Sequence, residues 1–144
     1  MSNAPASTGP AANVGTIVSA LLSGDGTYSL SGSRYTGSGI IVALPEFGGV
    51  IDSEVANETE AIVASWVANN AHAITGNPAP FFRPRYFGIW TDPDSDIVYL
   101  DIVEAFPREE YDEAIAAGIA RDQIAIWDNG RQELIETGGT GAVE

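Results

Sequence analysis

Residues 86–103 read YFGIWTDPDSDIVYLDIV, two aromatic and β-branched runs on either side of a polar turn. The runs 86–91 and 97–103 have the residue types that favour strands. The segment between them, DPDSD at 92–96, combines proline with aspartate and serine, whose side chains bond nearby backbone groups in turns. The stretch therefore predicts an antiparallel hairpin. Because the second run is apolar on both faces except at Asp101, we expect it to be a central strand.

A helix is predicted upstream of the hairpin, over residues 58–74. Asn57 precedes Glu58-Thr59-Glu60, so the side chains of Asn57 and Glu60 can each accept a hydrogen bond from the other's backbone N–H. Apolar residues then recur at steps of three and four, the period of an amphipathic helix. We expect the helix to stop at Gly76 and Asn77-Pro78-Ala79-Pro80 to form an extended linker, because proline lacks a backbone donor.

A second helix is predicted downstream of the hairpin. Pro107 suits the first helical turn, and the acidic residues that follow it suit the positive end of the helix dipole. Tyr111, Ile115 and Ile119 are spaced by four and form one apolar stripe, which we expect to face the core. Arg121 follows at the negative end of the helix, where a cation is favourable.

Shorter apolar runs predict the remaining strands, at 27–31, 39–44, 123–127 and 131–137. The run 16–22 fits either a short helix or a first strand. Whether residues 46–54 contain an irregular strand is left open. The order strand, helix, hairpin, helix, strand predicts an α+β fold. We expect an antiparallel sheet with two helices packed on one face, a ferredoxin-like βαββαβ core with extra edge strands.

The length and composition are those of one domain. The chain has 144 residues, and we expect a flexible tail over 1–14, a single α+β domain over 15–137 and a second flexible tail over 138–144. No run reaches the roughly 18 apolar residues that a membrane-spanning helix needs. Cysteine is absent, which excludes disulfides, zinc–thiolate sites, iron–sulfur clusters and thiol nucleophiles.

The charge is strongly negative, with 20 acidic residues against 6 arginines, no lysine and a formal net charge of −14. Such a field repels phosphate backbones and anionic lipid, so we expect neither direct nucleic-acid binding nor membrane binding. It favours a protein partner with a basic surface, although the same charge also serves solubility. A homo-oligomer is left open. The candidate acidic partner-binding residues are Glu109, Glu110, Asp112 and Glu113 on the second helix and Asp92, Asp94 and Asp96 at the hairpin tip.

Aromatic residues and arginines interleave in the segment 81–90. Aromatic rings between arginines can anchor a protein interface, and we take Phe82 and Tyr86 as further partner-binding candidates. The alternative is that alternate rings enter the core.

The alternate aspartates Asp92, Asp94 and Asp96 are also candidates for a calcium or magnesium site. A helix-loop-helix calcium loop has Gly at its sixth and Glu at its twelfth position, where this chain has Ile97 and Val103. The alternative is a hairpin tip whose aspartates bond their own backbone.

No catalytic or cofactor-binding residue is predicted. Asp101, Glu104 and Asp128 could form an acid–base group once the sheet assembles, but acids at strand ends also pair with arginines such as Arg85 or Arg131. His72, the one histidine, suits the C-terminal end of the first helix. The glycine-rich segments 37–39 and 138–141 do not lie between a strand and a helix, as a phosphate-binding loop does, and they predict no nucleotide site.

The segments YFGIWTDP at 86–93, IVYLD at 97–101, AIWDNG at 125–130 and ETGGTG at 136–141 resemble small uncharacterised accessory proteins of actinobacterial phages. The resemblance implies a phage accessory protein that acts in the host-cell cytoplasm, or a minor virion structural protein. Together with the charge, it favours a non-enzymatic acidic module that binds a host or phage protein. The alternative is a domain, with or without enzymatic activity, that binds a small molecule or divalent metal and is centred on Asp92, Asp94, Asp96, Asp101 and Asp128.

Overall fold

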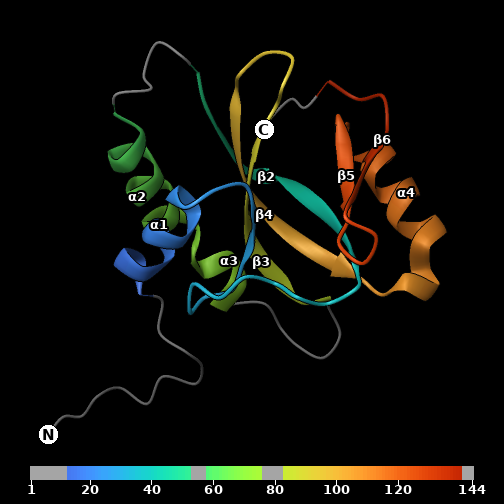
Figure 1. Ribbon diagram of the computed structural model, residues 1–144, viewed down its shortest axis with the longest axis horizontal. Coiled ribbons are helices and arrows are strands. Elements are labelled where there is room, and N and C mark those ends of the chain that lie inside the picture. Colours follow the sequence, from blue (N-terminus) through green and yellow to red (C-terminus); the bar gives the residue numbers. More distant parts are fainter. Residues whose placement is uncertain (1–12, 53–57, 76–82, 141–144) are drawn as a thin grey trace, which may run out of the picture.

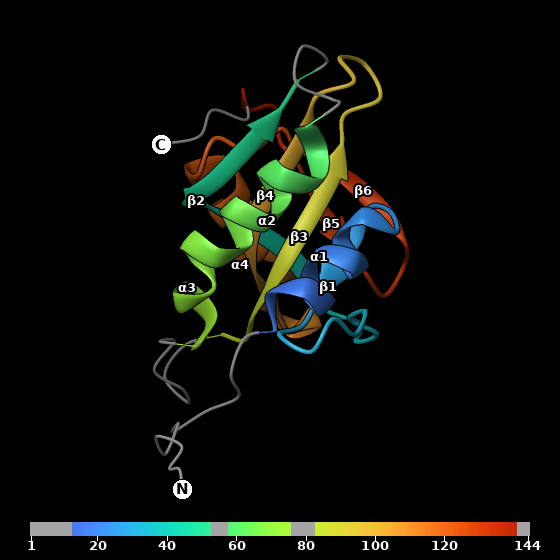
Figure 2. The ribbon, with the colours of Figure 1, turned by 90° about the vertical axis from the view of Figure 1, so that its left-hand side faces the viewer.

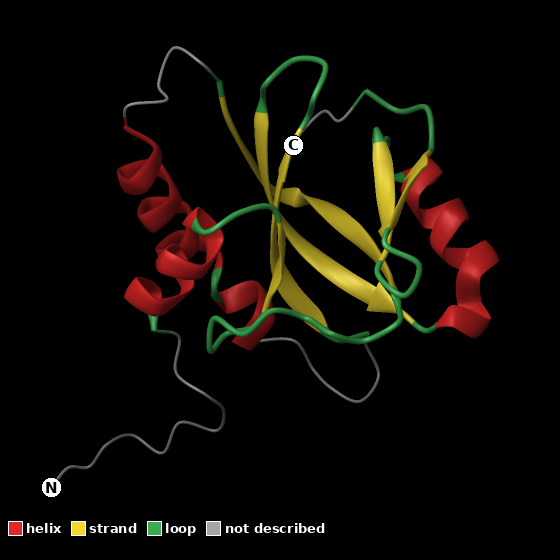
Figure 3. Ribbon diagram, in the orientation of Figure 1, coloured by secondary structure: helices red, strands yellow, loops and turns green. Residues whose placement is uncertain are grey.

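The computed structural model describes residues 13–52, 58–75 and 83–140. It confirms an α+β fold, in which these residues form a curled, antiparallel six-stranded sheet in the order β1-β3-β4-β2-β5-β6 (Figures 1 and 3). The strands are β1 (Gly26–Tyr28), β2 (Ile40–Ile51), β3 (Arg85–Thr91), β4 (Val98–Phe106), β5 (Ala125–Asp128) and β6 (Glu133–Glu136). The helices are α1 (Val14–Leu22), α2 (Thr59–Asn70), α3 (His72–Thr75) and α4 (Tyr111–Ala120), with a 3-10 turn, η2 (Arg108–Glu110), before α4.

The predicted hairpin is confirmed. Strands β3 and β4 pair from Arg85 opposite Glu104 to Thr91 opposite Val98. The turn closes when the Asp92 N–H donates to the Ile97 carbonyl at 2.9 Å. Strand β4 lies between β3 and β2, so the run that is apolar on both faces is an interior strand, as predicted.

The open alternative at 16–22 is resolved as a helix. Helix α1 begins at Val14, and the Asn13 side chain caps it by accepting the Thr16 N–H at 3.1 Å. Such a cap satisfies one of the first backbone donors of a helix, which have no partner within the helix itself. Of the predicted N-terminal tail, residues 1–12 lie outside the described residues.

The predicted helix over 58–74 is divided. Helix α2 ends at Asn70, and the short α3 follows after Ala71. The Asn70 side chain donates to the Trp66 carbonyl at 2.8 Å, so it competes for an acceptor of its own helix. The predicted cap Asn57, the stop at Gly76 and the proline linker 77–80 lie outside the described residues.

Strand β2 is longer than predicted and continues through Pro45. Its pairing with β4 shifts register between Leu44 and Gly49, so the proline lies at an irregularity. A proline in a strand is tolerated at such a place because no ladder hydrogen bond has to be donated there. Beyond the irregularity, the Trp66 indole N–H donates to the Phe47 carbonyl at 2.8 Å, which ties α2 to β2.

The predicted core stripe of the second helix is wrong. Tyr111 and Ile119 are 37% and 59% exposed, and Ile115 is half-buried. The buried positions of α4 are instead Ala114 and Gly118. A Cβ built on Gly118 would lie 2.7 Å from Cγ2 of Ile126, so the absence of a side chain lets α4 approach β5 closely. The small residues of α4 therefore face the sheet, Ile115 packs at the edge of the cluster beneath the helix, and Tyr111 and Ile119 stay exposed.

Alternate residues of β2 belong to different hydrophobic clusters, because successive strand residues point to opposite sides of a sheet. Leu44 and Ile102 pack beneath α1 and α2, which lie in front of the sheet in Figure 2. Ile40 and Val42 pack beneath α4 with Phe106, Ala114 and Ile126. We call this side of β2 and β4 the core side. The opposite side carries Ile41, Ala43, Val103 and Ala105, and we call it the pocket side.

Candidate functional site

A pocket of about 450 Å³ lies against the pocket side of the sheet. This volume is in the range of sites that hold small organic ligands. Its lining residues come from β1 to β6 and from the connecting segments at Asp25, at 34–35, at 123–124 and at 129–132. The pocket thus depends on the whole curled sheet.

Small residues leave room at the floor of the pocket. Gly88 lies directly opposite Asp101 in the pairing of β3 with β4, and Thr27 of β1 lies opposite Gly88 on its other side. A Cβ on Gly88 would lie 2.9 Å from Cγ1 of Val103, so a larger residue would crowd the floor. Ala43 of β2 and Ala125 of β5 also line the pocket, and their small side chains leave room there too.

Aromatic side chains line the pocket. The rings of Trp90 and Tyr99 stack, with centroids 5.8 Å apart and planes 26° apart. Trp127 and Tyr35 line it from β5 and from the loop before β2, and Tyr35 in turn packs on Tyr86 with ring centroids 5.0 Å apart. Aromatic rings provide a large apolar contact surface and can also bind cations over their faces.

Asp101 is the half-buried acid of the pocket. No donor of the described residues hydrogen-bonds to its carboxyl group, and its register partner, Gly88, has no side chain. Burial raises the pKa of Asp101 from 3.8 to about 7, because removal from water disfavours the charged form. A carboxyl group with such a pKa can be neutral or ionised near neutral pH and can either donate or accept a hydrogen bond.

The other charged groups of the pocket have partners. The Asp25 carboxylate accepts the Thr91 N–H and hydroxyl, both at 3.0 Å. The Arg34 guanidinium donates to the Tyr28 hydroxyl at 2.8 Å and lies over that ring, 5.0 Å from its centroid. Asp101 therefore differs from both in having no such bond.

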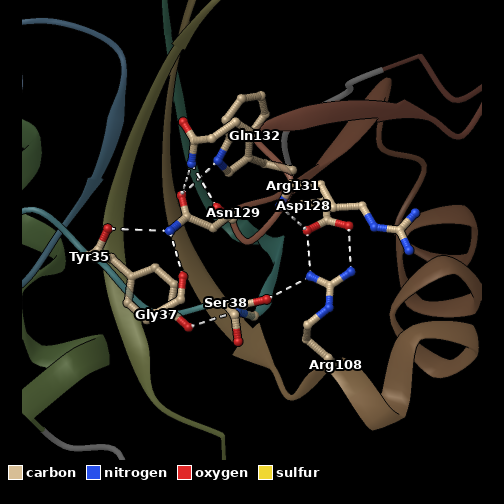
Figure 4. A network of polar contacts seen from close by, with 10 residues as sticks. Tyr35, Gly37, Ser38, Arg108, Asp128, Asn129, Arg131 and Gln132 are labelled. Carbon is tan, nitrogen blue, oxygen red and sulfur yellow. Dashed lines mark hydrogen bonds and ion pairs between the residues drawn. The ribbon is translucent and has the colours of Figure 1, made fainter.

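Asn129 holds one wall of the pocket in place (Figure 4). Its side-chain amide donates to the Gly37 carbonyl at 2.7 Å, and its side-chain oxygen accepts the Trp127 indole N–H at 2.8 Å. Gln132 donates to the Asn129 backbone carbonyl at 2.7 Å. These bonds join the 35–39 loop to the turn between β5 and β6, so two segments far apart in the sequence form a single rim.

The three acids that we considered as one acid–base group are not brought together. Asp101 lies on the pocket side, whereas Glu104 is on the core side, where Arg121 binds it at 2.5 Å. Asp128 is buried on the core side, and its carboxylate accepts two hydrogen bonds from the Arg108 guanidinium, at 2.6 and 2.9 Å (Figure 4).

Both core-side acids therefore pair with arginines, but not with the ones that the sequence suggested. Arg85 donates to the Ala73 carbonyl instead, and Arg131 gives Asp128 only its backbone N–H. The arginine at Asp128 lowers the pKa of that carboxyl to about 2, since hydrogen bonds from Arg108 stabilise the charged form.

The hairpin-tip aspartates form no group that could hold a metal. Among the described residues, three or more His, Asp or Glu side chains nowhere come close enough together for one. The Asp92 carboxylate instead accepts the Asp94 N–H at 2.9 Å and the Ser95 hydroxyl at 3.1 Å. Asp96 adopts a left-handed conformation with φ of 60°, which aspartate tolerates in tight turns. The tip thus has the self-bonded turn that was the alternative to a metal loop.

The acids of the second helix are in part exposed. Glu109, Asp112 and Glu113 face solvent, whereas Glu110 is half-buried and accepts two hydrogen bonds from Arg83, at 2.7 and 3.1 Å. Of the aromatic candidates, Tyr86 is half-buried on the pocket side, and Phe82 lies outside the described residues. His72 is exposed, and its ring meets the Phe47 ring edge-on at 6.0 Å.

Sequence reasoning missed Trp90, Trp127 and Asn129 as pocket residues. Trp90 and Trp127 stood in predicted strands, and only the strand pairing shows that they share a face with Asp101. The one signal present in the sequence was Asp101 itself, an acid in the middle of an apolar run.

Comparisons of the chain with protein-family models, with curated proteins and with solved structures found no match. Within the described part of the chain, the helices are too short or too polar to cross a bilayer.

Proposed function

We propose that the protein binds a small organic molecule with an apolar body in the pocket on the pocket side of the sheet. The observation that carries this proposal is a space of about 450 Å³ that combines aromatic walls with an unpartnered carboxyl group, Asp101. Sites for small molecules are typically concave, mostly apolar and equipped with few polar groups that orient the ligand.

The cost of Asp101 supports the proposal. An acid buried without hydrogen bonds destabilises the fold when it is ionised, so a purely structural role would be better served by an apolar residue. The pocket is also built on rigid strands and braced by Asn129, which limits the ordering that binding would require.

The proposal is tested by titrating the ¹⁵N-labelled protein with two neutral fragments, indole and 2-phenylethanol. We expect chemical-shift changes to centre on the amides of Gly88, Asp101 and Gln132. Ala125→Phe, which fills the pocket from β5, should abolish them. Ala116→Phe is the matched control, because it adds the same ring on the exposed face of α4 and should leave binding unchanged. Shifts that spread over the surface, or that survive in Ala125→Phe, would overturn the proposal.

A second function is favoured by one observation on α4. Tyr111 and Ile119 are exposed apolar residues on the same helix as the exposed acids Asp112 and Glu113. We propose that this helix surface binds a protein partner whose contact surface is apolar with a basic border, since the net charge of −14 attracts such a surface. This is the acidic protein-binding role that we expect from the sequence.

The α4 surface can be tested with a synthetic leucine- and lysine-rich amphipathic peptide. Binding mapped to α4 should weaken several-fold as salt is raised from 50 to 300 mM, because screening shortens electrostatic reach. It should be lost in the double variant Tyr111→Ser, Ile119→Ser and retained in Ala125→Phe. Equal binding to both variants would contradict the proposal.

The phage accessory role, the host-cell location and the virion alternative stay predictions from the resemblance.

We also propose that β2, β3, β4 and β5 with α2 and α4 form a ferredoxin-like core. The support is that each helix joins two strands with one strand between them, as in a split βαβ unit. Nuclear Overhauser contacts from α4 to Val42 and from α2 to Leu44 would agree with it, and contacts from α4 to Ile41 would contradict it.

A further inference from the structure

We infer that the ligand of this pocket is an organic cation, with an apolar body against the aromatic walls and its charged group against the Asp101 carboxylate. The inference rests on the proposed function, since it names the class of molecule that the same pocket takes.

The first argument is the missing partner of Asp101. On β4 the residue lies opposite Gly88, which has no side chain, and the neighbouring stretch of β2 is irregular around Pro45. No donor of the described residues reaches the carboxylate, so water or a ligand has to supply the hydrogen bond. A cationic donor supplies both the bond and the countercharge, and such bonds are roughly twice as strong as neutral ones.

The second argument comes from the charges around Asp101. The titratable and charged side chains that line the pocket beside it are Asp25, Arg34, Tyr35 and Tyr99. Arg34 is exposed and is bound to the Tyr28 hydroxyl and the Asp25 carbonyl, so it is not directed to Asp101 as a partner. Strands β3, β5 and β6 contribute no titratable side chain to the lining. An ionised Asp101 is thus left without a countercharge of its own.

The third argument is the aromatic lining. Trp90, Tyr99 and Trp127 line the same pocket as the carboxyl group, and ring faces attract cations within about 6 Å of their centroids. The net charge of −14 adds a long-range field that raises the local concentration of cations and lowers that of anions. The same features would disfavour an anionic ligand.

The protonation state of Asp101 should make the affinity for a cation depend on pH. Because burial raises its pKa to about 7, most free molecules carry a neutral Asp101 at pH 6 and an ionised one at pH 8. A cation binds the ionised form, so its affinity should rise about tenfold between these two pH values. A neutral ligand should show no such rise.

The experiment compares three probes of similar shape, 2-phenylethylamine, 2-phenylethanol and 3-phenylpropanoate, by amide chemical shifts at pH 6 and pH 8. At pH 8 we expect the amine to bind at least tenfold more tightly than the alcohol, and the carboxylate to bind most weakly. Asp101→Asn should reduce the affinity for the amine to that for the alcohol while it leaves the alcohol within about twofold. Asp94→Asn is the matched control, the same change at the exposed hairpin tip, and should alter neither.

The outcomes separate the two proposals. If the alcohol binds in the pocket but the amine binds no better, or if Asp101→Asn leaves the preference for the amine intact, the inference of a cation is wrong and the pocket function stands. If none of the three probes shifts the pocket amides, the pocket function itself is wrong. Binding of the alcohol to Asp101→Asn also shows that the variant is folded with its pocket intact.

Discussion

Acidic residues on the core side and on the pocket side of the sheet differ in whether an arginine binds them. On the core side, Glu104 of β4 is 5% exposed and Asp128 of β5, two strands away, is 1% exposed, and each is bound by an arginine. On the pocket side, Asp101 is half-buried and has no such partner among the described residues. Asp101 and Glu104 are thus three positions apart on β4, but only Glu104 has an arginine partner among the described residues.

This difference in pairing indicates different roles for the acids on the two sides. A buried ion pair with good geometry satisfies the charges that folding removes from water, so Glu104 and Asp128 belong to the structure of the domain. A carboxyl group that is removed from water and has no donor costs stability when it is ionised, and perturbed pKa values of this kind cluster at functional sites. This contrast supports our proposal that the pocket side carries the binding site.

The largest expected effect is a gain of stability in Asp101→Asn at pH 8. The pKa of Asp101 in the fold is about 7, above its ordinary value of 3.8, so ionisation favours the unfolded state. Stability of the native protein should fall as pH rises from about 4 to about 7, and the pKa difference is equivalent to about 4 kcal/mol. Urea unfolding should show the variant about that much more stable at pH 8 and little different at pH 4. A destabilised variant at pH 8 would mean that Asp101 has a structural partner.

The next effect is a loss of stability in Arg108→Ala, of about 3 kcal/mol at pH 7, because the variant leaves Asp128 buried and unpaired. In the native protein the pKa of Asp128 is lowered to about 2, so its contribution is present above pH 4 and is lost as pH falls toward 2. The variant should lack that acid-dependent loss. Arg131→Ala is the control: its exposed side chain makes no bond to Asp128, and the change should cost below about 1 kcal/mol in urea unfolding.

The smallest effect is expected for Gly118→Ala on the core side. Helix propensity alone would stabilise α4 by about 1 kcal/mol. The added Cβ would lie 2.7 Å from Cγ2 of Ile126, and overpacking of this kind costs about 1–3 kcal/mol. We therefore expect a net loss of about 1 kcal/mol in thermal or urea unfolding. A net gain of stability would show that α4 does not lie so close to β5.

Much of the fold was predictable because its signals are local. The turn residues 92–96 and the β-branched runs beside them predicted the hairpin, and the pattern of the run 97–103 predicted its interior position. The prediction for α4 was wrong in its orientation, since residue spacing shows a stripe but not whether small or large residues will meet the sheet. The pocket was not predictable for a similar reason, because its lining comes from six strands and from four segments that connect elements.

The amino-acid pattern was enough to establish the α+β class, the hairpin, the lack of cysteine chemistry and the negative charge, since each depends on composition or on neighbours within a few residues. Long-range packing decided which acids are buried and which of them have an arginine partner. Strand register put Asp101 opposite Gly88 and Glu104 on the other side, and the fold brought Arg108 and Arg121 to the acids that are buried. Burial and pairing are properties of the assembled sheet, so a carboxyl group acquires its pKa and its role only there.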